Sequence, residues 1–376
     1  MSWDIQPQMD DWRAQGLWRE LRLVESAQGA LVKVDGREMI NFSSNDYLGL
    51  ADSPVLRQAM QEGVELYGAG SGASRLVCGT LKPHRDLEDA LAAFKGTEAA
   101  LAFSSGYATA MGTIPVLVST GDTIILDKLC HASLVDAARL SGATIRVFPH
   151  NHLGKLEKLL ASAKGRVLVV TESIFSMDGD RCPLAEIVEL KDRHGAWLML
   201  DEAHAVGVIG PQGRGLAAAL GLEKRVELQM GTLSKALGLS GGYLAASRQV
   251  IDWLINRARS FIYSTAPPPA LAHAARVCVA EVIQGGEGEL RRLRLWEHLH
   301  RLRPGAPPAS AIVPQIIGDE QAAMALSARL RGAGLLIPAI RYPTVARGSA
   351  RLRITLSAAH TEAQIDRLWH ALEKVG

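Results

Sequence analysis

Between about residues 97 and 247 the hydrophobic positions alternate between two patterns. Seven short, nearly continuous apolar runs rich in β-branched residues predict strands, and the stretches between them repeat their apolar residues at helical spacing. Glycines follow those helical stretches, as helix C-termini favour. Such alternation is typical of an α/β fold with a mainly parallel sheet buried on both faces. The predicted strands are AALAFSS, DTIILD, ATIRVFP, RVLVVTES, WLMLDEA, VELQMGT and GGYLAAS.

The two flanks of this region follow other patterns. Residues 1–50 predict a helix, a hairpin over residues 30–44 that turns at Asp35-Gly36, and the loop SNDYLGL. Three prolines interrupt the pattern at residues 263–270, and we expect a long helix after them. The C-terminal part predicts a smaller α+β domain, with helices over residues 321–334 and 361–375 and strands over 335–340 and 350–356.

Length and composition limit the classes of protein to which this chain can belong. At about 150 residues per domain, 376 residues suggest two domains. We expect an N-terminal segment 1–45 that packs with the small domain, a large domain 46–275 and a small domain 276–376. The net charge of +2 argues against nucleic acid or a membrane surface as partner. The N-terminus lacks a signal pattern and no apolar run reaches about 18 residues, so we expect a cytoplasmic protein.

The four cysteines lie far apart in the sequence, without the spacing of a metal site. This pattern argues against a disulfide scaffold or structural zinc, and no metal is expected. His150 and His152 also lack a carboxylate or thiol at ligand spacing, so we expect them in a solvated loop. The basic cluster at 291–303 predicts a solvated helix face, with docking of a phosphopantetheine carrier as the alternative.

The motif DEAH at 201–204 directly follows the predicted strand WLML. In an open α/β sheet ligands bind beyond the carboxyl ends of the strands, so Asp201 and His204 are candidates for a binding crevice. Taken alone, the motif is explained as simply by a helix-capping aspartate and a core histidine. The motif also occurs in helicases, but the phosphate-binding pattern GxxxxGK[ST] is absent from this chain.

Two further motifs favour a binding site over these simpler explanations of DEAH. Lys235, in GTLSKALG, follows another predicted strand and has small, apolar neighbours, whereas most lysines are solvated. SSGYATA turns from a strand into a helix, whose first N–H groups suit an anion. Together the three motifs describe a pyridoxal-phosphate site. Gly106 and Tyr107 would hold the phosphate, Lys235 the aldehyde and Asp201 the ring nitrogen.

The chain resembles the α-oxoamine synthases, a family of fold type I pyridoxal-phosphate enzymes. The similarity runs through FSSNDYLGL, GSGASRLVCGT, HRDLE, DKLCHASLVDAARLSG, FSMDGD, DEAHAVGVIG, TLSKALG, FIYSTAPPPA and ARLRITLSAAHT. It implies a fold type I transferase fold, with a mainly parallel seven-stranded sheet in the large domain and a smaller α+β C-terminal domain. It also implies a homodimer that condenses L-alanine with pimeloyl-CoA or pimeloyl-acyl carrier protein, in biotin biosynthesis.

The resemblance also implies roles for individual residues. Lys235 would bind the cofactor as a Schiff base and move the substrate Cα proton, and His204 would pair with the phenolic oxygen of the ring. His131 would stack on the ring, and Arg353 would bind the amino acid carboxylate. The resemblance implies catalytic roles for Lys235, His131, His204 and Asp201. It implies cofactor contacts for Gly106, Tyr107, Ser176 and Thr232, and for Ser264 or Thr265 from the other subunit. It implies substrate contacts for Arg19 (or Arg22), Asn45, Thr344 and Arg353.

Two departures from the family pattern concern the acyl group. Tyr342 replaces the first proline of the usual IRPPTV, and the stretch 301–313 looks shortened. Glycine C-acetyltransferase or another α-oxoamine synthase is therefore the alternative within the family. A serine hydrolase using Ser240, in the pattern GLSGG, and a cofactor-binding regulatory domain are alternatives of other classes. The strand GGYLAAS follows Ser240 instead of preceding it, which is unfavourable for a nucleophile elbow.

Overall fold

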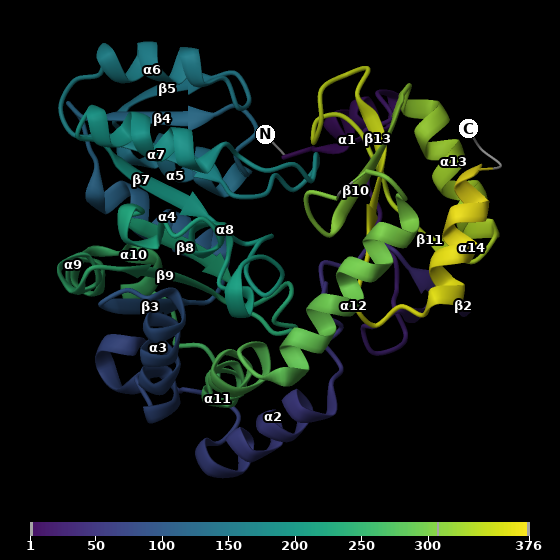
Figure 1. Ribbon diagram of the computed structural model, residues 1–376, viewed down its shortest axis with the longest axis horizontal. Helices are drawn as coiled ribbons and strands as arrows, with labels where there is room; N and C mark the ends of the chain where they lie inside the picture. Colours follow the sequence, from purple (N-terminus) through teal and green to yellow (C-terminus); the bar gives the residue numbers. More distant parts are fainter. Residues whose placement is uncertain (1–2, 307, 374–376) are drawn as a thin grey trace.

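The computed structural model describes residues 3–306 and 308–373, which form two lobes joined by long helices (Figure 1). In that part of the chain no helix has both the length and the apolar character that crossing a membrane requires. The larger lobe contains a seven-stranded sheet in the order β3-β9-β8-β7-β6-β4-β5. All seven predicted strands are confirmed: β3 (Ala99–Phe103), β4 (Thr123–Asp127), β5 (Thr144–Phe148), β6 (Val167–Glu172), β7 (Trp197–Asp201), β8 (Leu228–Thr232) and β9 (Gly242–Ala246).

The sheet is mainly parallel, as predicted. Only β9 runs antiparallel to its neighbours β3 and β8. Side chains alternate between two apolar layers, because successive residues of a strand point to opposite faces. Ile124 and Leu126 face one layer and Ile125 the other. The first layer is covered by α4 (Gly106–Leu117), α5 (Ala132–Ser141) and α9 (Arg248–Arg257), and the second by α3 (Lys82–Lys95), α6 (Leu153–Ala161), α7 (Leu184–Arg193) and α11 (Pro269–Val277).

The smaller lobe contains two three-stranded sheets. In the first, β1 (Leu31–Val34) and β2 (Arg37–Asn41) form the predicted hairpin, and β2 also pairs with β11 (Leu335–Leu336). Asp35 and Gly36 both have positive φ, as the tight turn requires. The second sheet has the order β10-β13-β12, with β10 at Ile312–Gly318, β12 at Ala339–Ile340 and β13 at Ala350–Thr355.

Three expectations for this lobe were wrong in detail. Residues 335–340 form two short strands in different sheets instead of one, because the chain turns at Pro338, which has no N–H to donate. Strand β10 was not predicted; it contains Pro314 and is an edge strand, where proline is tolerated. The long helix after the prolines is interrupted between the π-helical segment Cys278–Ile283 and α12 (Gly286–Leu302).

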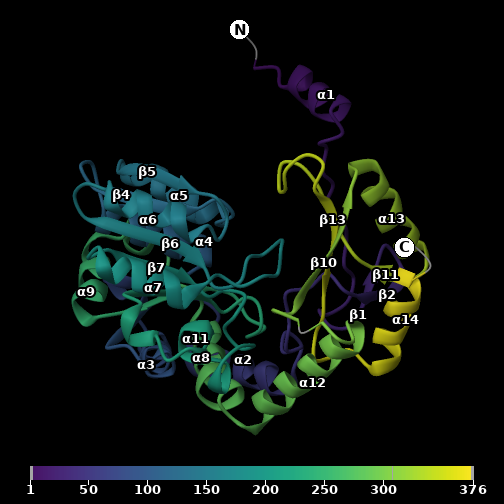
Figure 2. The same cartoon turned by 45° about the horizontal axis from the view of Figure 1, so that its top comes forward.

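The remaining helices lie, along the chain, at its two ends and between the elements already described. Helix α14 ends at Glu373, and the last two residues of the helix predicted over 361–375 lie outside the described part of the chain. Figure 2 shows α1 standing away from both lobes, and none of its side chains is buried. The helices not yet placed are α1 (Gln6–Ala14), α2 (Pro54–Tyr67), α8 (Leu216–Ala219), α10 (Arg259–Ile262), α13 (Glu320–Gly332) and α14 (Glu362–Glu373).

The carboxyl ends of the parallel strands are tied to the smaller lobe. Ser357 Oγ donates a hydrogen bond of 2.7 Å to the carbonyl oxygen of Asp46. Arg353, on β13, donates to the carbonyl oxygen of Ser176, in the loop after β6. These contacts place the loop after β6 beside β13 and hold the segment at Asp46 against the C-terminal part of the chain. We propose that the domain boundaries lie near residues 45 and 275.

Candidate active site

The candidate lysine lies in the loop between β8 and β9. Lys235 Nζ is 2.8 Å from His204 Nε2. Burial lowers the pKa of Lys235 to about 8, against the opposing effect of the carboxylates of Asp201 and Glu172. A lysine with this pKa is partly neutral near neutral pH, and the neutral amine is the form that attacks an aldehyde.

Asp201 is the last residue of β7 and is buried. Its Oδ1 accepts a hydrogen bond of 2.9 Å from the Ala203 backbone N–H, and within the described residues its Oδ2 has no hydrogen-bond donor. Burial raises the pKa of Asp201, while the charge of Lys235 acts in the opposite direction. A buried carboxylate with one free oxygen is suited to a protonated ring nitrogen, which would offset the cost of burying its charge.

Sequence reasoning missed Glu172, the last residue of β6. It lies opposite Asp201 in the register of the two parallel strands, so the two side chains share a face of the sheet. Its Oε1 accepts a hydrogen bond of 2.5 Å from the His131 backbone N–H. Burial and the Asp201 charge raise the pKa of Glu172 well above its usual value, while the charge of Lys235 acts in the opposite direction. An acidic residue closing a buried apolar strand was the available signal.

A chain of hydrogen bonds connects Lys235 to Arg353. His204 Nδ1 is 2.6 Å from Tyr47 Oη, which donates to Asn45 Oδ1 over 3.1 Å. The same Asn45 oxygen accepts from Arg353 Nη2 over 3.0 Å. Burial keeps the pKa of His204 well below its usual value and raises the pKa of Tyr47 to about 12, so both side chains are neutral. Tyr47, inside the motif SSNDYLGL, was not among the predicted site residues.

Arg353 is buried, and its contacts fix the plane of its guanidinium. Besides its bond to Asn45, its Nε donates over 2.6 Å to the carbonyl oxygen of Ser176. Nη1 has no hydrogen-bond acceptor among the described residues. This nitrogen, beside Nη2, is available to a carboxylate, which an arginine binds in a planar, two-bonded geometry.

The start of α4 fits an anion. Ser105 caps the helix by accepting from the Ala108 N–H, and the N–H groups of Gly106 and Tyr107 have no acceptor within the described part of the chain. A Cβ at Gly242 would lie 2.5 Å from the Gly106 nitrogen, so only glycine permits this turn to approach β9. The Tyr107 side chain turns to Asp136, to which its hydroxyl donates over 2.9 Å.

The other predicted cofactor residues lie in different elements of the fold. Thr232 ends β8 beside Gly106, and its hydroxyl donates to the Gly241 carbonyl oxygen over 2.7 Å. His131 caps α5 at the end of β4, and burial lowers its pKa. Thr265 forms an isolated bridge with Ser74. That Ser264 or Thr265 contributes to a second subunit's site stays a prediction.

Two of the residues predicted to contact the substrate, Arg19 and Thr344, lie close together. Arg19 Nη2 lies 3.4 Å from Thr344 Oγ1, although 325 residues separate them. The loop with Thr344 is held to the N-terminal segment, since Arg341 donates to the carbonyl oxygens of Gly16 and Trp18. The structure thus brings Arg19 to the loop with Thr344; that either residue contacts the substrate stays a prediction.

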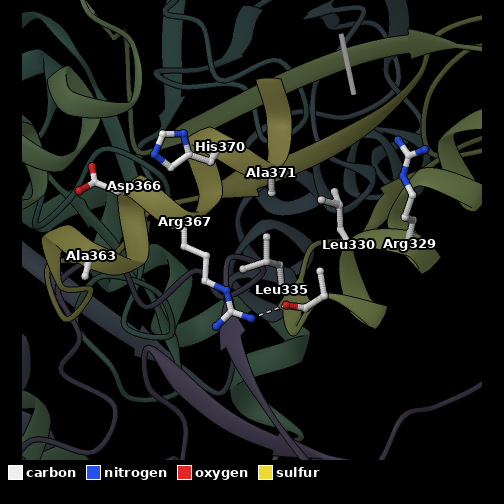
Figure 3. Close-up of a pocket in the computed structure, with 9 residues that line it drawn as sticks. Arg329, Leu330, Leu335, Ala363, Asp366, Arg367, His370 and Ala371 are labelled. Atoms are coloured by element: carbon white, nitrogen blue, oxygen red, sulfur yellow. Dashed lines mark hydrogen bonds between the residues drawn. The ribbon is translucent and has the colours of Figure 1, made fainter. Parts of the chain in front are cut away.

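The residues present fit pyridoxal phosphate. Unpaired helix N–H groups follow β3, a lysine of lowered pKa follows β8, and a buried carboxylate with a free oxygen ends β7 of the same sheet. Ser240 is exposed, and the imidazole of His204 is hydrogen-bonded to Lys235 and Tyr47 instead of to Ser240. The hollow of about 710 Å³ in Figure 3 is elsewhere, between α13 and α14, and none of the predicted site residues lines it.

Comparisons with known proteins extend over nearly the whole chain. The sequence profile described as aminotransferase class I and II matches residues 37–372. An 8-amino-7-oxononanoate synthase from Geobacter sulfurreducens is 47% identical over 386 residues, covering 100% of this chain and 98% of that protein. Sphingomonas wittichii serine palmitoyltransferase superposes with a TM-score of 0.93 at 31% identity, covering 99% and 97%. A structure described as SPT with PLP internal aldimine gives 0.94 at 30%, covering 100% and 98%.

Proposed function

Since this chain belongs to the class I and II aminotransferase family, and within it to the 8-amino-7-oxononanoate synthases, we propose that it condenses L-alanine with a pimeloyl thioester. The products are 8-amino-7-oxononanoate, carbon dioxide and the free thiol. The α-oxoamine synthase resemblance, the fold type I architecture and the pyridoxal-phosphate cofactor are confirmed. The substrate pair and the residue roles below are proposals.

The cofactor is needed because an unassisted amino acid Cα is far too weak an acid. Pyridoxal phosphate, when bound, supplies an aldehyde that joins to amines and a ring that accepts the electrons of the Cα–H bond. Asp201 would hold the proton on the ring nitrogen with its free oxygen. The N–H groups of Gly106 and Tyr107 would bind the phosphate.

Proton transfer at the amino acid falls to Lys235. Its pKa of about 8 suits a general base near neutral pH, and the neutral imidazole of His204 is 2.8 Å from its Nζ. The hydrogen bond with Tyr47 orients that imidazole, so that its Nε2 faces the lysine. Arg353 would bind the alanine carboxylate and thereby align the Cα–H bond with Lys235.

Selectivity for the acyl group must come from residues away from Lys235, because the residues around Lys235 have the same roles with every amino acid and thioester that the family uses. The Arg347 guanidinium lies 4.3 Å above the ring of Tyr342, in the same loop as Thr344. Arg19 reaches this loop from the N-terminal segment. A surface with an aromatic ring and two guanidinium groups is suited to a chain of methylenes that ends in a carboxylate, as pimeloyl does and acetyl does not.

The observation that carries the proposal is the convergence of Lys235, His204 and the free oxygen of Asp201 at the ends of β7 and β8. The test is a side-by-side thiol-release assay of alanine with pimeloyl-CoA and glycine with acetyl-CoA. Each buried methylene is worth roughly 0.8 kcal/mol, so burying three favours pimeloyl on the order of fiftyfold. A higher kcat/KM for the acetyl pair would identify a glycine C-acetyltransferase instead. A parallel assay with pimeloyl-acyl carrier protein distinguishes the two carriers.

A further inference from the structure

The loop after β6 connects the two lobes at the candidate site. Its Ser176 carbonyl oxygen accepts from Arg353 Nε over 2.6 Å, and Asp178 forms an ion pair of 2.7 Å with Arg351. Ser310 Oγ donates to the Gly179 carbonyl oxygen over 2.7 Å. The position of loop 175–180 therefore determines the orientation of the Arg353 guanidinium.

The loop is held from the sheet side by His150, which follows β5. Its Nδ1 is 3.0 Å from Asp127 Oδ1, and its Nε2 is 2.8 Å from Asp180 Oδ2. Because a carboxylate only accepts hydrogen bonds, both ring nitrogens must carry a proton, which makes the ring an imidazolium. The expectation of a solvated loop histidine was wrong here, since the tertiary fold places His150 between two acids far away in sequence.

Other contacts show that this arrangement is built into the fold. Burial lowers the pKa of His150, but the hydrogen bonds to Asp127 and Asp180 outweigh it and raise the value to about 10. The Phe175 ring meets the imidazole edge-on, with centroids 4.3 Å apart. Asn151 has a φ of 55°, which lets its N–H reach Asp127 Oδ2 over 2.8 Å and its side chain reach Asp180 over 3.2 Å.

We propose that His150, cationic between Asp127 and Asp180, is a positioning residue that holds loop 175–180 and so aligns Arg353 with the amino acid carboxylate. The inference rests on the proposed role of Arg353 in binding the amino acid. It does not depend on the identity of the acyl donor. Both ends of the connection are anchored, since Asp127 is fully buried at the end of β4 and Arg353 is buried on β13.

The test uses the variant His150→Asn in the holoenzyme, with His152→Asn as matched control. His152 lies two residues away and caps α6, a role that asparagine also fills. Alanine is titrated into each protein, and its Kd is read from the change in visible cofactor absorbance. We expect Kd and KM for alanine to rise about tenfold in His150→Asn, with kcat and the KM for pimeloyl-CoA within twofold of wild type. An unchanged alanine Kd would overturn the inference.

A second variant covers the case that His150→Asn does not fold. Asp180 is substantially exposed, so Asp180→Asn removes one charge of the bridge at little cost to the core. We expect the same selective rise in alanine Kd; a Kd equal to that of wild type counts against the inference. The outcome is separable from that of the proposed function. If wild type binds alanine but releases no thiol from pimeloyl-CoA, the proposed function fails, while the alanine Kd values still decide the role of His150.

Discussion

Burial lowers the pKa of Lys235 to about 8, and two carboxylates beside it limit that shift. Of those two, Asp201 has an oxygen without a hydrogen-bond donor, which is available to the cofactor ring, whereas Glu172 accepts a hydrogen bond from the His131 backbone N–H. Neighbouring buried acids whose pKa values are both raised are typical of sites that handle protons. The division of roles between Asp201 and Glu172 follows from their hydrogen bonds and not from their residue type.

Replacing Lys235 with alanine removes both the amine that attaches the cofactor and the base that moves the Cα proton. General acid–base catalysis alone contributes about 10²–10⁴-fold, so we expect kcat to fall at least a thousandfold. Thiol release measures the loss. In wild type, borohydride reduction and peptide mapping should find the cofactor on Lys235, and a label on another lysine would refute the assignment.

Replacing Asp201 with asparagine keeps the size of the side chain but removes its charge. A hydrogen bond to a charged group is worth about 2 kcal/mol, so we expect kcat to fall about 30-fold while the protein still binds cofactor. Cofactor content is read from visible absorbance and kcat from thiol release. Near-normal kcat at neutral pH would mean that Asp201 only caps the turn to Ala203.

At the scale of elements, the ends of β6, β7 and β8 and the loop 175–180 position much of the candidate site. Glu172, Asp201 and Thr232 end adjacent strands of the sheet, so their positions follow from the parallel register. The loop 175–180 then crosses to β13, where Arg353 lies. Because an element end places a side chain more precisely than a free loop, the His150 bridge is needed only for the loop.

The His150 bridge also predicts how stability depends on pH. The folded-state pKa of about 10 lies above the ordinary histidine value of 6.5, so the stabilisation is fully present below about pH 6.5 and is lost as the pH rises toward 10. The groups that face His150 are the side chains of Asp127 and Asp180. Urea unfolding of wild type and His150→Asn should show a difference that shrinks from pH 6 to pH 10. A difference independent of pH would contradict the charged state of His150.

At the scale of the whole molecule, the site depends on both ends of the chain. Asn45 and Tyr47 come from the N-terminal part and Arg353 from the C-terminal part, and 308 residues separate Asn45 from Arg353. The N-terminal segment also has exposed apolar side chains, among them Trp3, Ile5 and Leu21. Large apolar side chains exposed together on one segment are typical of interaction surfaces.

We therefore expect the protein to be a homodimer. Sedimentation velocity should give a species of twice the 40.4 kDa of one chain at assay concentration. If Ser264 or Thr265 completes the partner's phosphate site, replacing both with alanine should weaken cofactor binding without changing the folded structure. A fully active species with the mass of one chain would refute the dimer.

The sequence by itself determined the α/β class and the seven strands of the large sheet, and it supplied the candidate residues of the cofactor site. This is because apolar periodicity and strand-end motifs are local, and a parallel sheet brings the ends of its strands to one edge. Only the tertiary structure decided the roles of Tyr47, Glu172 and His150, the assignment of residues 335–340 to two sheets, and β10 with its Pro314. Each of these depends on burial or on a partner far away in sequence. The charge of a histidine between two aspartates depends on distances that no local sequence pattern contains.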